Sequence, residues 1–289
     1  MQASLSLTRF APAPTGFLHL GHVVNALYVW RMARERGARV LLRIEDHDAQ
    51  RSRPEYERAL LEDLDWLGFV PDLFPTDAFR AGRCESRQSN RHKLYEEAAG
   101  RLMQAGLVYG CACTRRELGA EAEPGVDAGA ERRYPGTCRN RGLTPRYRLN
   151  WRVRLEPGVE TFTDLLCGPA SQDPQAQCGD VVIRDRLGNW TYQFVASVDD
   201  WLQGIDLVIR GEDLLASTGR QIRLARLLGR PTPATFAHHP LVMKSPSQKL
   251  SKSDGDTGVR ELRARGWTRE QVIEAALRSL PGRWHPPEA

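Results

Sequence analysis

The sequence predicts an α/β fold with a doubly wound parallel sheet. Three observations lead to this prediction: β-rich segments alternate with helical patterns, glycines end several of those patterns, and buried-strand patterns return in the second half of the chain. The β-rich segments lie near Thr8 and at 39–45, 180–184 and 205–213, and the helical patterns at 21–36, 52–67, 87–105 and 269–280. In such a fold the ligand site lies at the carboxyl ends of the strands.

The helix expected after residue 51 has clear local signals. Ser52 is placed to cap its amino terminus, Pro54 falls in its first turn, and Gly68 follows its last turn. Its apolar residues recur every three to four positions, which predicts one buried face.

Length and composition set limits on the function. The 289 residues suffice for one large α/β domain with an insertion. Lys and Arg number 41 against 36 Asp and Glu, a net charge of +5 that permits an RNA partner without establishing one. No export signal or membrane-spanning apolar run is present, so we expect a cytoplasmic protein whose six cysteines are reduced thiols or metal ligands.

The quartet His19-Leu20-Gly21-His22 leads into the first helical pattern. A helix amino terminus presents free N–H groups and partial positive charge, which suits a phosphate. Gly21 permits close approach to the backbone, and both imidazoles can donate to phosphate oxygens. Taken alone, the motif is explained equally well by packing or surface histidines.

The second motif, Lys249-Leu-Ser-Lys252-Ser253, lies in a Ser- and Gly-rich stretch typical of a loop. Two lysines in such a loop can close over a triphosphate, although a solvated basic loop is the alternative. Together the two stretches resemble the HIGH and KMSKS signatures of class I aminoacyl-tRNA synthetases. The resemblance implies a Rossmann-like catalytic domain that uses ATP with Mg²⁺. It implies ATP binding by His19, Gly21, His22 and Lys252, and catalytic roles for His19, His22, Lys249 and Lys252.

The stretch from Arg43 to Asp48 resembles the R-I-E-D-T-D signature of the glutamyl and glutaminyl branch of class I. Glu45 at a strand end is suited to the ammonium group of an amino acid, and Arg9 to a side-chain carboxylate, which accepts a bidentate guanidinium as an amide cannot. The alternatives are a charged loop and a surface arginine. The resemblance implies a glutamate pocket formed by Arg9, Ala11, Ala13, Glu45, Tyr192 and Arg210. Ala196 stands where related enzymes often have asparagine, which predicts looser glutamate binding.

Cys111-Ala-Cys113 and Cys138 supply three soft ligands, one short of a closed tetrahedral zinc site. Their spacing resembles that of shortened glutamyl-tRNA synthetase paralogues, in which a tyrosine oxygen is the fourth ligand. This implies one structural Zn²⁺ bound by the three thiolates and Tyr134. We expect the unpaired Cys84, Cys167 and Cys178 to be buried or inert, and His238 and His239 to serve packing.

Residues 147–155 alternate strictly between apolar and basic or polar, which predicts a half-buried strand with a basic outer face. That face is either solvated or turned toward RNA. The predicted division is 1–105 and 166–242 for the halves of the catalytic domain, 106–165 for the insertion, and 243–289 for the lysine loop and a short helical C-terminal segment.

After Ser253 the sequence shows one helical pattern and a proline-rich tail, whereas an anticodon-reading domain needs on the order of 100 residues. In this respect the chain is similar to the glutamyl-queuosine tRNA(Asp) synthetases. The resemblance implies tRNA-independent activation of L-glutamate and its transfer to queuosine in the anticodon stem-loop of tRNA(Asp). We expect the protein to be a monomer. The alternatives are a truncated glutamyl-tRNA synthetase that charges a 3′ end, a small-molecule nucleotidyltransferase with an H-x-G-H site, and a non-catalytic tRNA-binding module.

Overall fold

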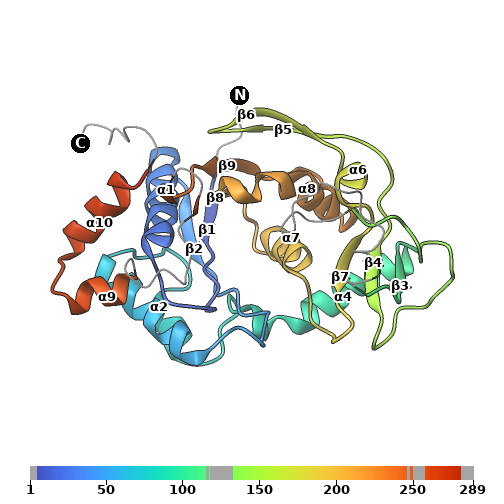
Figure 1. Ribbon diagram of the computed structural model, residues 1–289, viewed down its shortest axis with the longest axis horizontal. Helices are drawn as coiled ribbons and strands as arrows, with labels where there is room; N and C mark the ends of the chain where they lie inside the picture. Colours follow the sequence, from blue (N-terminus) through green and yellow to red (C-terminus); the bar gives the residue numbers. More distant parts are fainter. Residues whose placement is uncertain (1–4, 115–116, 118–132, 246–247, 250–257, 281–289) are drawn as a thin grey trace.

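A six-stranded mixed sheet forms the centre of the molecule (Figure 1). The computed structural model describes residues 5–114, 117, 133–245, 248–249 and 258–280. The strands are, in spatial order, β2 (Arg39–Leu42), β1 (Leu7–Phe10), β8 (Leu207–Gly211), β9 (Thr235–His239), β5 (Glu160–Asp164) and β6 (Gly168–Gln172). The first five run parallel, and β6 pairs with β5 in the antiparallel direction. The predicted parallel sheet is therefore confirmed for five strands and carries an antiparallel edge.

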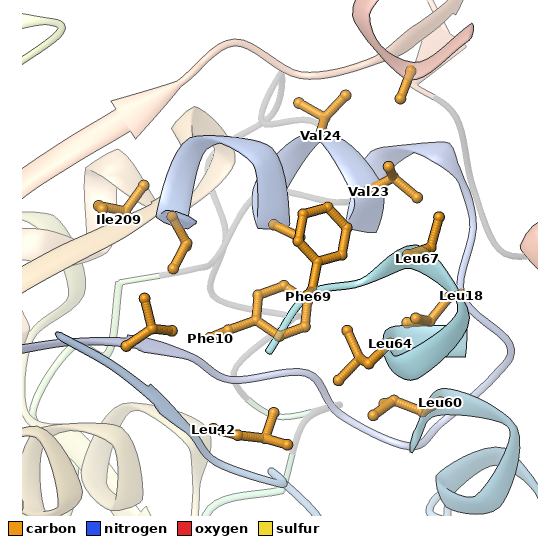
Figure 2. Close-up of a cluster of buried hydrophobic side chains, with 14 of the residues drawn as sticks. Phe10, Leu18, Val23, Val24, Leu42, Leu60, Leu64, Leu67, Phe69 and Ile209 are labelled. Carbon is orange, nitrogen blue, oxygen red and sulfur yellow. The ribbon is translucent and has the colours of Figure 1, made fainter. Parts of the chain in front are cut away.

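Helices cover both faces of this sheet. Because side chains alternate along a strand, Phe10, Leu42 and Ile209 face α1 (Leu20–Arg36), whereas Val208 and Phe236 face α8 (Thr218–Leu227). Figure 2 shows the first of these cores, in which side chains of β1, β2 and α2 (Pro54–Leu67) converge beneath α1. The two cores fix the register of the sheet and hence the positions of the polar residues at its carboxyl edge.

A second sheet contains β3 (Val108–Cys111), β4 (Asn150–Val153) and β7 (Val181–Arg184), all antiparallel. Its apolar face packs with α4 (His92–Gln104) and α7 (Tyr192–Leu202) through Tyr95, Val153, Ile183 and Phe194. The expectation that residues 180–184 return to the central sheet is therefore wrong, because β7 pairs with β4.

The strand expected over residues 147–155 is shorter than its alternation suggests. Tyr147 is 71% exposed, and Arg148 has φ 68°, which interrupts the extended backbone before β4 begins. Arg152, assigned to a basic outer face, is buried. Its guanidinium donates to the Asp180 carbonyl at 2.6 Å and stacks 3.6 Å from the centre of the Tyr134 ring, and these contacts offset part of the cost of its burial.

The remaining elements connect these layers. They are α3 (Thr76–Arg80), η1 (Gln88–Asn90), α6 (Pro174–Cys178), η2 (Glu212–Ser217), β10 (Met243–Ser245), β11 (Gln248–Lys249), α9 (Val259–Ala264) and α10 (Arg269–Arg278). Arg53, not Ser52, occupies the cap position of α2 and makes no side-chain capping bond, while Gly68 ends that helix in the left-handed conformation as expected. Within the described ranges, no helix has both the length and the apolar character needed to cross a membrane.

Candidate active site

The carboxyl edge of the central sheet gathers two arginines and a histidine on one face. Arg9 lies on β1, Arg210 on β8 and His238 on β9, and Arg210 pairs directly with His238 in the strand register. The alternation that turns Val208 and Phe236 toward α8 places these residues on the same side of the sheet. All three are at most 4% exposed. Such burial of charged groups requires specific partners.

Asp200 of α7 is shared between two guanidinium groups. Its Oδ1 accepts from Arg9 Nε at 3.1 Å and from Arg43 Nη1 at 2.8 Å. Burial acts to raise the pKa of Asp200, but the charges and hydrogen bonds of Arg9 and Arg43 outweigh it and lower that pKa to about 2. Asp200 is therefore a carboxylate at neutral pH and fixes Arg9, whose Nη1 also donates to the Ile209 carbonyl.

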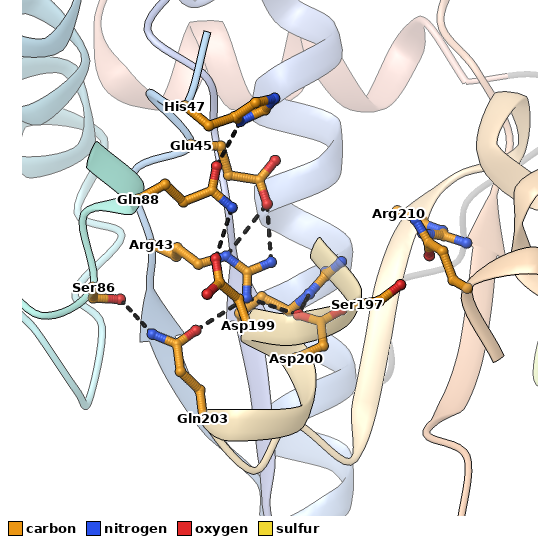
Figure 3. Close-up of polar contacts among 12 residues, drawn as sticks. Arg43, Glu45, His47, Ser86, Gln88, Ser197, Asp199, Asp200, Gln203 and Arg210 are labelled. Atoms are coloured by element: carbon orange, nitrogen blue, oxygen red, sulfur yellow. Dashed lines mark hydrogen bonds and ion pairs between the residues drawn. The ribbon is translucent and has the colours of Figure 1, made fainter. Parts of the chain in front are cut away.

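Glu45 presents one carboxylate oxygen to the protein. Its Oε1 accepts from Arg43 Nε at 3.3 Å and Nη2 at 2.9 Å, and these contacts orient the side chain (Figure 3). Among the described residues, no hydrogen bond or ion pair involves Oε2. A buried carboxylate with one oxygen already oriented is suited to an ammonium group on the other.

Arg210 is a buried cation whose partners are neutral. Its Nε donates to His238 Nε2 at 2.9 Å, and its terminal nitrogens donate to Gln221 Oε1, Thr218 Oγ1 and the Leu214 carbonyl. In the described part of the chain, no carboxylate lies within ion-pair distance of it. Burial lowers the pKa of Arg210, the direction expected where a positive charge lacks a counter-ion. An uncompensated buried cation favours an anionic ligand.

Tyr192, at the amino terminus of α7, lies between these groups. Burial raises the pKa of its hydroxyl, with a further contribution from the nearby Glu45 carboxylate, so the hydroxyl stays protonated and can donate. Arg210 and Arg9 are close enough to act on the same hydroxyl in the opposite direction. The structure thus brings Glu45, Arg9 and Arg210 close enough to Tyr192 for their charges to act on its hydroxyl. The role of these four residues as a glutamate pocket stays a prediction. Ala11 and Ala13 lie on the loop after β1, and Ala196 is fully buried in α7.

The H-x-G-H motif forms the amino terminus of α1. His19 Nδ1 accepts from Gly21 N–H at 3.1 Å, and His22 Nδ1 accepts from His19 N–H at 3.1 Å, an arrangement in which each ring caps the helix. Since both Nδ1 atoms accept, each neutral ring carries its proton on Nε2 and can donate there. A Cβ on residue 21 would lie 2.9 Å from His19 Cε1, so a larger residue in place of Gly21 would displace that ring.

The chain returns to this motif after the lysine loop. Val259 N–H, at the start of α9, donates to the Leu18 carbonyl at 2.9 Å, and Gly258 bridges with His19. Lys249 lies in β11, which pairs with β10, whereas Lys252 lies outside the described residues. The segment that contains both lysines therefore ends beside the two imidazoles.

Three thiols and a phenol meet at the end of β3. The sulfur atoms of Cys111, Cys113 and Cys138 lie within 4.8 Å of one another. The Tyr134 hydroxyl lies 3.5 Å from Cys111 Sγ and accepts from the Cys138 N–H at 2.7 Å. Burial raises the pKa of the Cys113 thiol to about 12, with contributions from the neighbouring sulfur groups. A divalent cation would reverse this shift, since metal ligation deprotonates thiols.

The other cysteines follow the prediction in part. Cys84 and Cys178 are buried, as expected, but Cys167 is exposed. It lies in the turn between β5 and β6, where its backbone N–H donates to Asp164 and its thiol contacts the His238 carbonyl. His239 packs as predicted, stacked on Tyr28 at 4.7 Å. His238 does more than pack, because it contacts Arg210.

A cavity of about 690 Å³ opens beside Asp46, between the loop that follows β2 and helices α2 and α3. Its charged lining residues are three arginines and three carboxylates: Arg53, Arg58, Arg80, Asp46, Glu57 and Glu62. Because these charges balance, the cavity is not the cationic surface that a phosphate requires.

Comparison with known proteins identifies the family. Residues 6–281 match the family model described as tRNA synthetases class I (E and Q), catalytic domain. The chain belongs to this family. It is therefore a member of the aminoacyl-tRNA synthetase ligases, and its α/β fold is the class I synthetase fold.

Individual relatives of this class I synthetase differ in length. The glutamyl-Q tRNA(Asp) synthetase of Cupriavidus metallidurans is 39% identical over 290 residues, which cover 96% of this chain and 90% of that protein. The glutamate–tRNA ligase of Sulfurihydrogenibium sp. is 39% identical over 97% of this chain but 59% of that protein. The glutamate–tRNA synthetase structure from Elizabethkingia anophelis has a TM-score of 0.71 at 32% identity, covering 87% of this chain and 53% of that chain. The chain thus spans less than two thirds of the length of these two glutamate enzymes.

Several contributors to the site were missed at the sequence level. Asp199 and Asp200 occupy an otherwise apolar stretch of α7, and Asp199 accepts from Gln88, Arg91 and Tyr95. Two adjacent acids in a helix buried on most sides were the available signal, because buried carboxylates require partners. Asp164 carried no comparable signal, since it ends a strand whose neighbours are exposed.

Proposed function

We propose that the protein activates L-glutamate with ATP, without requiring tRNA, and transfers it to the queuosine of tRNA(Asp). The observation that carries the first step is the placement of Arg9, Glu45 and Arg210 around one buried site. Two cations and one anion are the complement of a dicarboxylic amino acid, in which Arg9 takes the side-chain carboxylate, Glu45 the ammonium group and Arg210 the α-carboxylate.

The nucleotide side of the proposal rests on the α1 amino terminus. His19 and His22 present Nε2–H donors there, next to the partial positive charge of a 17-residue helix. We assign Gly21 to the close backbone approach of ATP, and Lys249 and Lys252 to charge neutralisation as pyrophosphate leaves. Mg²⁺ would accompany ATP and offset part of the negative charge of its phosphates.

The reaction then has two steps. An oxygen of the glutamate α-carboxylate attacks the α-phosphorus of ATP, a glutamyl adenylate forms, and pyrophosphate departs. A hydroxyl of the queuosine base then attacks the adenylate carbonyl carbon, and AMP leaves as the ester forms. No protein nucleophile is needed, because positioning and electrostatic stabilisation account for both steps.

The choice of acceptor is supported by the relatives. Proteins named glutamyl-Q tRNA(Asp) synthetase align with this chain over 77–90% of their own lengths at 39–43% identity. Charging of a tRNA 3′ end is the second candidate, because relatives named glutamate–tRNA ligase are equally similar over the shared region. Single-stranded anticodon loops present unstacked bases, which makes a base acceptor physically reasonable.

We also propose that Cys111, Cys113, Cys138 and Tyr134 bind one structural Zn²⁺. Three sulfur atoms within 4.8 Å and a phenol oxygen at 3.5 Å from one of them fit a tetrahedral S₃O donor set. Bound zinc would cross-link the end of β3 to the segment that precedes β4. We also propose a monomer and a division of the chain at 105/106, 165/166 and 242/243. In this division β5, from the insertion, completes the central sheet beside β9, and β7, from the second catalytic half, pairs with β4 of the insertion.

The decisive experiment follows labelled glutamate. Glutamate-dependent exchange between ATP and pyrophosphate, without tRNA, tests the first step, and its absence would refute activation. For the second step, tRNA(Asp) with and without queuosine is incubated with labelled glutamate and ATP, then digested with a ribonuclease. Label in the anticodon fragment of the queuosine-bearing tRNA alone supports the proposal. Label on the 3′-terminal adenosine of both tRNAs would establish the second candidate instead.

A further inference from the structure

Asp164, His238 and Arg210 form a hydrogen-bonded row across three neighbouring strands of the central sheet. Asp164 ends β5, His238 lies on β9 and Arg210 on β8. Asp164 Oδ2 lies 2.5 Å from His238 Nδ1, and His238 Nε2 lies 2.9 Å from Arg210 Nε. Their exposed fractions are 2%, 1% and 4%. The row is therefore removed from solvent and ends at a proposed substrate ligand.

The contacts determine which nitrogen of His238 carries the proton. Arg210 Nε can only donate, so His238 Nε2 must accept. The Thr218 hydroxyl, 3.2 Å from the same nitrogen, is a second potential donor to it. Nδ1 then carries the proton and donates to the Asp164 carboxylate. Burial lowers the pKa of His238, which keeps the ring neutral at pH 7.

Asp164 is itself held rigidly. Its Oδ1 accepts from the backbone N–H groups of Leu166, Cys167 and His238 at 2.9–3.1 Å. Burial acts to raise the pKa of Asp164, but the His238 bond and these backbone donors outweigh it and lower the pKa far below its ordinary value. One carboxylate oxygen is thus committed to the backbone, and only the other faces the imidazole.

Arg9 and Arg210, the two arginines proposed to bind the substrate carboxylates, are therefore held in different ways. Arg9 forms a direct ion pair with the carboxylate of Asp200. Arg210 instead contacts a neutral imidazole, and the nearest carboxylate in its row lies on the far side of that ring. A direct ion pair would compete with the substrate for Arg210, whereas an imidazole orients the guanidinium without neutralising it.

We propose that Asp164 and His238 are positioning residues that orient Arg210 for the substrate carboxylate while leaving its charge uncompensated. This inference rests on the proposed function, because it assigns Arg210 to glutamate. Asp164 fixes the Nδ1–H tautomer of His238. The Nε2 atom of His238 then accepts a hydrogen bond from Arg210 and orients it, and Arg210 contacts the substrate carboxylate.

The variant Asp164→Asn tests the row with almost no change in volume. The three backbone donors require an acceptor, so the Asn carbonyl oxygen takes the place of Oδ1 and the amide NH₂ faces His238. His238 Nδ1 must then accept a hydrogen bond from this amide. The ring proton moves to Nε2, where it faces the Nε–H donor of Arg210. We expect a 10- to 100-fold loss of glutamate affinity, about the value of a hydrogen bond to a charged group, with ATP affinity unchanged.

Two substitutions at position 238 provide a rescue test. His238→Gln can place a carbonyl oxygen where Nε2 lies, and we expect glutamate affinity within about threefold of the parent protein. His238→Leu removes the acceptor and should lose affinity to the same extent as Asp164→Asn. Asp173→Asn is the matched control, because Asp173 also accepts from backbone N–H groups, at Ala176 and Gly158, but caps α6.

Two measurements on the 289-residue protein decide the outcome. Imidazole ¹⁵N NMR, assigned with His238→Gln among the seven histidines, should show an Nδ1–H tautomer that becomes Nε2–H in Asp164→Asn. Calorimetry measures glutamate and ATP binding separately. An Nε2–H tautomer in the parent protein, unchanged glutamate affinity in Asp164→Asn and His238→Leu, or equal losses for glutamate and ATP would each overturn the positioning role. Failure of the parent protein to bind glutamate would instead refute the proposed function, and the NMR result would then describe only the row itself.

Discussion

Replacing Asp200 with asparagine should destabilise the protein strongly, because this carboxylate holds two buried guanidinium groups. Its pKa is about 2, compared with an ordinary value of 3.8, and its side chain is 10% exposed. A shift of this size corresponds to about 2–3 kcal/mol of stability at neutral pH. Removal of one partner of a buried ion pair costs about 3–5 kcal/mol, because the remaining charges lose their compensation. We therefore expect Asp200→Asn to reduce the free energy of unfolding by about 2–5 kcal/mol.

The pH dependence of the unfolding free energy provides a second test of this prediction. The folded-state pKa of Asp200 lies below its ordinary value, so its contribution is present above about pH 4 and is lost as pH falls toward 2. The difference in unfolding free energy between the parent protein and Asp200→Asn should accordingly be constant from pH 7 to pH 5 and shrink below pH 4. Urea unfolding monitored by tryptophan fluorescence measures both quantities.

A surface pair supplies the control. Asp77 also contacts an arginine, at 2.9 Å from Arg80, but its side chain is 90% exposed. Because exposed ion pairs contribute little, Asp77→Asn should change the free energy of unfolding by less than about 0.5 kcal/mol. A loss below about 1 kcal/mol for Asp200→Asn, or a loss that is unchanged at pH 3, would refute the view that Asp200 is a buried counter-ion shared by Arg9 and Arg43.

Three further predictions concern the proposed sites. Arg9→Gln should raise the glutamate KM in the pyrophosphate-exchange assay about 10- to 100-fold while the ATP KM stays constant, since one charged hydrogen-bonding group is lost; equal changes in both constants would contradict this assignment. Cys138→Ser should lower the zinc content measured by atomic absorption and reduce the Tm, and a metal-free parent protein with the same Tm would exclude a structural zinc. Lys252→Ala, at a position outside the described residues, should abolish exchange but leave glutamate binding measurable by calorimetry, and normal exchange would remove Lys252 from catalysis.

Local patterns predicted much of the fold and the proposed nucleotide site. The glycine that ends α2, the helix that starts within H-x-G-H, and the strand ending at Arg210 and Gly211 all follow from signals within a few residues. The glutamate-pocket assignment of Arg9, Glu45 and Arg210 came from the family resemblance. Their positions near or after strand ends agree with it, because the carboxyl ends of parallel strands meet at one edge.

Long-range pairing was not accessible in the same way. The residues of β7 contain no signal that predicts pairing with β4 and not with a strand of the central sheet. Arg152 fits an alternating basic face, yet a ring and a carbonyl from distant segments make its burial acceptable. The role of Asp164 likewise depends on His238, which is 74 residues away in the sequence. These are contacts of tertiary structure, and single-sequence periodicity carries no information on them.

Charge balance gives a reason for glutamate to be preferred over glutamine in the proposed pocket. The proposed substrate-binding groups and their direct ion-pair partners carry one net positive charge: Arg9, Arg43 and Arg210 are positive, and Asp200 and Glu45 are negative. The Asp164 carboxylate is not in this set, because the His238 ring separates it from Arg210. Glutamate brings one net negative charge and makes the complex neutral, whereas glutamine leaves a buried cation without a counter-ion, which costs several kcal/mol. Discrimination between glutamate and glutamine should then depend on the charge of the amino acid side chain and not on its shape. It should collapse in Arg9→Gln, which removes the net positive charge of this set of groups, and should survive a volume change such as Ala196→Gly in α7. If Arg9→Gln lowered the affinity for both amino acids by the same factor, charge balance would not be the source of the preference.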